Sequence, residues 1–240
     1  MKMLKNTLVL VALAFVSTAC LAPPTESPIP EIRFADADST NETLVVMLPG
    51  RGDRAEVFAR EGFEKAGEQH GFDTIMVDAH FGYYMRRSLI PALHNDIILP
   101  AREAGYETIW LLGVSMGGLG SLLYTSQHPD EVDGLILLAP FLGDDDVIEE
   151  VKNAGGLGQW NPEESQVKDY EIDAWSWLQD DLLSDSPTPI LLGYGTSDSL
   201  ASAYPVLTDV LHPDNVLAIE GDHGWKTWKV LWAEIAARVQ

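Results

Sequence analysis

Between residue 41 and the carboxyl terminus, six short runs of apolar residues alternate with segments long enough to form helices. Within each run the hydrophobicity is continuous rather than alternating, which indicates strands that are covered on both faces. The six predicted strands are residues 44–48, 74–78, 109–112, 134–139, 189–194 and 216–219. The pattern therefore predicts an α/β fold, a three-layer α/β/α sandwich around a mostly parallel central sheet.

The segments between the predicted strands carry apolar residues at helical spacing. They predict crossover helices over residues 54–70 and 87–104 and a closing helix over residues 225–239. Residues 141–186 form a longer interval than one crossover helix requires, so we expect a short cap insertion there. No internal repeat is visible, and a single domain is predicted over residues 41–240.

A serine lies in a glycine-flanked motif directly after the third predicted strand. The motif is G-V-S-M-G at residues 113–117, and a helix-like stretch follows it. A serine hydroxyl is a poor nucleophile unless a tight turn presents it to a base, and the flanking glycines leave room for that turn. The sequence therefore predicts Ser115 as a nucleophile on a strand–turn–helix elbow.

A carboxylate and a histidine follow Ser115 at the ends of later strands. Asp198 comes shortly after the fifth predicted strand, and His223 comes shortly after the sixth. Because the carboxyl ends of parallel strands meet at one edge of a sheet, we expect the three side chains to lie together. His223 would act as the base toward Ser115, and Asp198 would orient its imidazole. Asp222 and Asp173 are the alternative candidates for the acid.

With these motifs in this chain order, residues 41–240 resemble the α/β-hydrolase fold family, and in particular its carboxylesterase-like and lipase-like serine hydrolases. The resemblance implies an oxyanion hole made of two backbone N–H groups and no cofactor. One N–H is that of Met116. The other is that of Arg51, in the loop after the first predicted strand. Relatives carry His-Gly-x in this loop; here Gly50 matches and Pro49 replaces the histidine.

Three further residues are candidates for contact with a substrate. His80 follows the second predicted strand at the same edge of the sheet. Trp160 and Trp175 lie in the cap insertion, where they could line a substrate entrance. The alternative for each tryptophan is that it anchors a short helix to the body of the domain.

The amino terminus has a composition of its own. Two lysines precede an almost unbroken apolar run, and small residues lead to Cys20, the only cysteine of the chain. The run is too short to cross a membrane, so residues 1–19 are predicted to be a cleaved signal peptide. Cys20 resembles the lipidated cysteine of a bacterial lipobox, which implies export and a lipid anchor in the cell envelope, with the outer membrane favoured. Residues 20–40 are predicted to be the lipidated N-terminus and a proline-rich tether.

The predicted reaction is cleavage of a carboxylic ester through an acyl-enzyme on Ser115, with a small-molecule ester or a lipid as substrate. Two other classes stay open. One is a non-hydrolytic enzyme of the same fold, such as a lyase or a cofactor-free haloperoxidase. The other is a catalytically idle lipoprotein that binds a partner at the surface. We predict no metal site, because no segment has the spacing of a known metal-ligand motif.

The formal net charge of the chain is −22, and it becomes −24 without the two lysines of the predicted signal peptide. A body this acidic repels nucleic acid, so nucleic acid is not an expected partner. The charge does not identify a substrate, and the sequence does not determine the oligomeric state.

Overall fold

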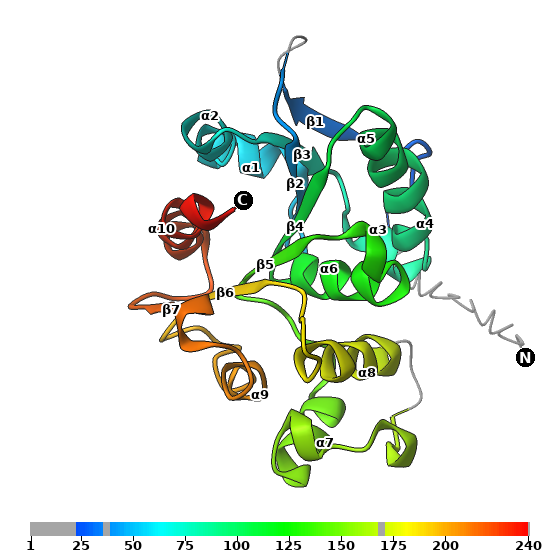
Figure 1. The fold of residues 1–240 in the computed structure, drawn as a ribbon, viewed down its shortest axis with the longest axis vertical. Coiled ribbons are helices and arrows are strands. Elements are labelled where there is room, and N and C mark those ends of the chain that lie inside the picture. Colours follow the sequence, from blue (N-terminus) through cyan, green and yellow to red (C-terminus); the bar gives the residue numbers. More distant parts are fainter. Residues whose placement is uncertain (1–22, 36–38, 168–170, 240) are drawn as a thin grey trace, which may run out of the picture.

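A seven-stranded sheet forms the centre of the protein in a computed structural model that describes residues 23–35, 39–167 and 171–239 (Figure 1). Its strand order is β1-β3-β2-β4-β5-β6-β7, with β1 antiparallel to β3 and every other pair parallel. The strands are β1 (Glu31–Phe34), β2 (Thr43–Leu48), β3 (Asp73–Val77), β4 (Thr108–Val114), β5 (Gly134–Leu138), β6 (Ile190–Gly195) and β7 (Val216–Ile219). The predicted mostly parallel sheet and its six predicted strands are confirmed.

Successive residues of β2 pack into two different layers, which explains why their hydrophobicity is continuous. Leu44 and Val46 belong to the core on one face of the sheet, and Val45 and Met47 belong to the core on the other. All four side chains are fully buried. The predicted three-layer arrangement is therefore confirmed.

Each layer of helices can be followed in Figure 1. The face of Val45 and Met47 is covered by α1 (Ala55–Glu61), α2 (Lys65–His70) and α10 (Trp225–Ile235). The opposite face is covered by α3 (Phe81–Met85), α4 (Leu89–Ala92), the π-helical segment η1 (Leu93–Ile98), α5 (Leu99–Glu103) and α6 (Met116–Gln127), together with α8 (Glu171–Leu182) and α9 (Pro205–Thr208). Short 3-10 turns complete the chain at η2 (Pro129–Glu131), η3 (Leu157–Gln159), η4 (Pro162–Glu164), η5 (Pro213–Asn215) and η6 (Ala236–Arg238).

The predicted helix over residues 54–70 is two helices rather than one. Gly62 lies between them with a φ of 78°, a left-handed conformation that ends α1. Apolar spacing alone could not place this break, since residues on both sides of it face the same core.

The segment between β5 and β6 is an insertion, with α7 (Asp145–Ala154) and α8 as its main helices. α8 packs against α6, the helix that follows Ser115. The insertion therefore lies on the α6 side of the sheet.

The amino-terminal segment differs from the predicted tether. Residues 31–34 form an edge strand of the sheet, and Ile29 is buried in the core. The Ile29 N–H donates to a carboxylate oxygen of Asp96 at 2.8 Å, and the Asp78 N–H donates to the carbonyl of Pro30 at 2.8 Å. The prolines favour an extended backbone, as we expected, but apolar side chains between them pack that backbone onto the domain. The boundary at residue 41 is corrected accordingly, because residues 29–34 belong to the domain.

Among the described residues, no helix is long and apolar enough to cross a membrane. The predicted signal peptide and Cys20 lie outside the described residues.

Candidate active site

Ser115 lies at the turn between β4 and α6 with a φ of 51° and a ψ of −115°. A positive φ is strained for a residue with a side chain, and it turns the hydroxyl out of the sheet edge. A Cβ at position 117 would collide with the carbonyl oxygen of Leu48, and one at position 113 would collide with the backbone of Gly117. The two glycines of the motif are therefore required by backbone contacts on both sides of the turn.

The structure brings Ser115, His223 and Asp198 into one hydrogen-bonded line. The Nε2 atom of His223 lies 2.9 Å from the Oγ of Ser115, and its Nδ1 atom lies 2.8 Å from Oδ2 of Asp198. The side chain of Asp198 is fully buried, whereas 24% of the His223 side chain is exposed. A buried carboxylate at this distance holds the ring in the tautomer that leaves Nε2 free to accept a proton.

The backbone of its own loop fixes the orientation of the Asp198 carboxylate. The N–H of Leu200 donates to Oδ1 of Asp198 at 2.7 Å, which leaves Oδ2 for the imidazole. Burial, together with the negative charge of Asp198, raises the pKa of Tyr204 above its ordinary value. The phenol therefore stays neutral beside the carboxylate.

The neighbouring acid Asp222 makes a different contact. Its Oδ1 atom accepts from the hydroxyl of Thr227 at 3.3 Å. Asp173, the other alternative, lies on α8 in the insertion. Of the three carboxylates considered from the sequence, Asp198 is the one that pairs with His223.

The two residues predicted to supply an oxyanion hole lie in the two segments that adjoin Ser115, the start of α6 and the loop of residues 49–53. Met116 is the first residue of α6, so its N–H has no acceptor within the helix and lies at the positive end of the helix dipole. A Cβ at Gly50 would lie 3.4 Å from the Cβ of Ser115, which shows how closely the loop of residues 49–53 passes the nucleophile. Arg51 follows Gly50 in this loop, with its guanidinium 4.6 Å from the centre of the Phe81 ring.

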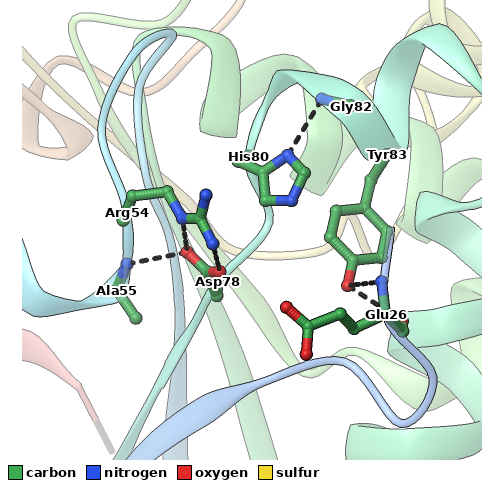
Figure 2. A network of polar contacts seen from close by, with 7 residues as sticks. All are labelled: Glu26, Arg54, Ala55, Asp78, His80, Gly82 and Tyr83. Carbon is green, nitrogen blue, oxygen red and sulfur yellow. Dashed lines mark hydrogen bonds and ion pairs between the residues drawn. The ribbon is translucent and has the colours of Figure 1, made fainter. Parts of the chain in front are cut away.

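His80 caps the amino-terminal end of α3. Its Nδ1 atom accepts from the N–H of Gly82 at 3.1 Å, and Figure 2 shows the ring turned toward that backbone group. Only 5% of the residue is exposed. Burial, aided by the positive charge of Arg54, lowers the pKa of His80. The proposed contact with substrate is therefore replaced by a structural role at the start of a helix.

The same network ties the loop of residues 49–53 to the sheet. Arg54, the residue after this loop, makes two hydrogen bonds of 2.7 and 2.6 Å to the carboxylate of Asp78, the residue after β3 (Figure 2). The hydroxyl of Tyr83 donates to the carbonyl of Glu26 at 2.9 Å, so the amino-terminal segment is joined to α3 at the same place.

Trp160 and Trp175 do not line an entrance, because both are buried at 6% and 3% exposure. Their rings meet edge to face, and the indole N–H of Trp175 donates to the carbonyl of Leu142 at 3.0 Å. The expectation of a substrate contact is wrong for both. They anchor the insertion, which is the alternative that the sequence left open.

Two positioning contacts were missed from the sequence. The indole N–H of Trp225 donates to Oδ2 of Asp53 at 3.1 Å, and the hydroxyl of Tyr84 donates to the carbonyl of Met116 at 3.1 Å. Asp53 stands 172 positions from Trp225, so no local pattern could have paired them.

Comparisons with known proteins agree with this architecture. The family model of the alpha/beta hydrolase fold matches residues 43–166. S-formylglutathione hydrolase (FrmB) from Staphylococcus aureus is 16% identical, with a TM-score of 0.60 over 91% of this chain and 100% of that one. Est1E from Butyrivibrio proteoclasticus with ferulic acid bound is 19% identical, with a TM-score of 0.57 over 88% and 93%. A monoacylglycerol lipase from Paleococcus ferrophilus is 15% identical, with a TM-score of 0.50 over 88% and 99%.

A comparison with the curated proteins found no match. The family model, however, matches more than half of the chain, and it includes β2, the elbow at Ser115 and β5. The chain therefore belongs to the alpha/beta hydrolase fold family.

Proposed function

We propose that this protein is a serine hydrolase that cleaves carboxylic esters through an acyl-enzyme on Ser115. The observation that carries the proposal is the line of hydrogen bonds from Ser115 through His223 to the buried Asp198, at 2.9 and 2.8 Å. A loop serine without a catalytic role needs neither a histidine nor a buried carboxylate behind that histidine.

In the proposed reaction, the Oγ of Ser115 attacks the ester carbonyl carbon while its proton passes to Nε2 of His223. The carbonyl electrons move to oxygen, and the N–H groups of Met116 and Arg51 stabilise the resulting oxyanion. Collapse of the tetrahedral intermediate breaks the ester C–O bond, and the departing alkoxide takes the proton from His223. Water then repeats the sequence on the acyl-enzyme and restores Ser115.

Three similar structures support an ester as the substrate class. They are an S-formylglutathione hydrolase, a protein with ferulic acid bound and a monoacylglycerol lipase. Another, from Staphylococcus aureus, is described as a fluorophosphonate-binding serine hydrolase and is 18% identical, with a TM-score of 0.56 over 85% of this chain and 87% of that one. The strong negative charge of this chain favours neutral esters over anionic ones.

The proposal is tested with a fluorophosphonate probe and a panel of p-nitrophenyl esters of increasing acyl length. We expect labelling and turnover by the parent protein and neither by Ser115→Ala. Equal labelling of both proteins, or turnover that survives the substitution, would contradict the nucleophile. The acyl-length preference then separates an esterase from a lipase.

We further propose that Cys20 carries a lipid that holds the protein on the bacterial cell envelope, at the outer membrane. The basic and apolar composition of residues 1–19 supports export, and the small residues before Cys20 support its lipidation. Pro23 packs against Gly82, which lies in α3. Tyr84 of the same helix donates a hydrogen bond to the carbonyl of Met116, next to Ser115. A lipid on Cys20 would therefore be attached near the proposed active site. We expect Cys20→Ser to release the protein from membranes, and continued membrane association of this variant would contradict the anchor.

A further inference from the structure

Two histidines and a glutamate meet on the surface at the far end of α6 from Ser115. His94 lies in η1, His128 follows the last residue of α6, and Glu131 ends η2. Each offers one ligand atom, and these three atoms all lie within 4.8 Å of one another. Since α6 has 12 residues, the cluster is about 18 Å from the nucleophile and forms no part of the proposed active site.

The carboxylate of this cluster is held in place by its surroundings. The hydroxyl of the buried Tyr124 donates to Oε2 of Glu131 at 2.5 Å. The guanidinium of Arg102 donates to the backbone carbonyl of Glu131 at 3.0 Å. The first contact is to the oxygen atom that the imidazoles also approach, and the second fixes the backbone that carries the carboxylate. Hydrogen bonds to a ligating carboxylate are usual in metal sites.

The two imidazoles approach the same oxygen atom from neighbouring elements. The Nδ1 atom of His94 lies 3.0 Å from Oε2 of Glu131, and that of His128 lies 3.9 Å from it. Ligand atoms around a tetrahedral Zn²⁺ ion are about 3.4 Å apart, so each of these two distances lies within about 0.5 Å of that spacing. His94 also lies in a π-helical segment, a rare conformation that is frequent at functional sites.

One movement is required for all three residues to bind a single ion. The rings of His94 and His128 are stacked, with centres 4.3 Å apart and planes 14° from parallel. In this arrangement the nitrogen lone pairs of the two rings point in parallel directions rather than toward one common ion. The His128 ring also stacks on Tyr124, with centres 4.9 Å apart. Because 27% of its side chain is exposed, the ring can turn toward Glu131 on the solvent side by leaving both stacks.

From this geometry we propose that His94, His128 and Glu131 bind one divalent transition-metal ion of the Zn²⁺ class. Two imidazoles and one carboxylate suit Zn²⁺, Co²⁺ or Ni²⁺ and disfavour Mg²⁺ and Ca²⁺, which prefer oxygen ligands. Water completes the coordination on the exposed side. The ion joins η1 to the turn after α6, so its role is to stabilise this edge of the domain.

The test is a calorimetric titration of the full chain, without a polyhistidine tag, with Zn²⁺ alone. We expect one ion per chain, a higher midpoint of thermal unfolding with Zn²⁺, and no competition from excess Mg²⁺. His94→Gln and His128→Gln should each weaken binding by at least about tenfold. Circular dichroism of the metal-free variants establishes that they are folded.

His212→Gln is the matched control, because His212 also lies beside a carboxylate, with its Nδ1 atom 3.6 Å from Asp214, on an exposed turn. This variant should bind Zn²⁺ as the parent does. Absence of saturable binding to the parent would overturn the proposal. Binding that survives the double substitution of His94 and His128, or that is lost equally in His212→Gln, would also overturn it.

Discussion

The indole N–H of Trp225 donates a hydrogen bond to Asp53 and so joins the two loops that flank Ser115. Asp53 ends the loop that carries Arg51, and Trp225 follows His223 by two residues. We expect Trp225→Phe to lower kcat/KM for a p-nitrophenyl ester by roughly tenfold, since small displacements of positioned groups are costly. Steady-state kinetics of the two proteins measure this effect.

Trp232→Phe is the control for that substitution. Trp232 also donates through its indole, to the carbonyl of Phe63 at 3.0 Å, but this acceptor lies between α1 and α2 and not in the loop of residues 49–53. Both variants should lose about 1 kcal/mol of unfolding free energy through the missing hydrogen bond. Equal losses of kcat/KM in both variants would contradict a positioning role for Trp225.

The pairing of His223 with Asp198 predicts a large difference between two aspartates. Asp198→Asn keeps the shape of the side chain but favours the wrong tautomer of the imidazole, so we expect kcat to fall by about 10⁴-fold. Asp222→Asn, next to His223 in the chain, should change kcat by less than about fivefold, because Asp222 bonds to Thr227 instead. A reversed order of the two effects would assign the acid to Asp222.

The buried position of Trp175 predicts an effect on stability and none on substrate binding. Trp175→Phe removes the donor to Leu142 and leaves that carbonyl without its partner, which should cost about 1–2 kcal/mol of unfolding free energy. KM should be unchanged. Urea unfolding measures the effect on stability, and steady-state kinetics measure the effect on KM. A raised KM with unchanged stability would indicate that Trp175 contacts the substrate.

Five of the six strands that sequence analysis found, β2 to β6, are buried along almost their whole length. The sixth, β7, is a partly exposed edge strand, and it was found because its four residues are all apolar. β1 was missed because it is a four-residue edge strand with alternating polar residues, and its burial is only partial. With two apolar and two charged residues, β1 has the composition of a loop. Its pairing partner β3 lies about 40 residues away, so the pairing could not be read locally.

The three proposed catalytic residues were found because each follows a strand that the apolar pattern locates. The apolar pattern does not show which face of a helix or loop a side chain occupies. For this reason the sequence could not decide whether Trp160 and Trp175 line an entrance or anchor the insertion. His128 and Glu131 stand three positions apart, which is a local signal for a shared ligand. His94 lies 37 positions from Glu131, and only the packing of η1 against α6 brings it there.

The capping role of His80 predicts a dependence of stability on pH. Burial, with Arg54 nearby, lowers the pKa of His80 in the folded protein below its ordinary value of about 6.5. As the pH falls, the unfolded chain therefore takes up this proton first. The contribution of His80 to stability is complete above the unfolded pKa and is lost as the pH falls below it.

His80→Asn isolates this contribution, because the amide oxygen of asparagine can still accept from the N–H of Gly82 at the start of α3. The unfolding free energy, measured in urea, should fall more between pH 7.5 and 5.5 for the parent than for His80→Asn. Every other titrating group is shared by the two proteins, so the difference between their curves reports on His80 alone. Parallel curves would mean that the His80 imidazole takes up its proton as readily in the folded protein as in the unfolded chain.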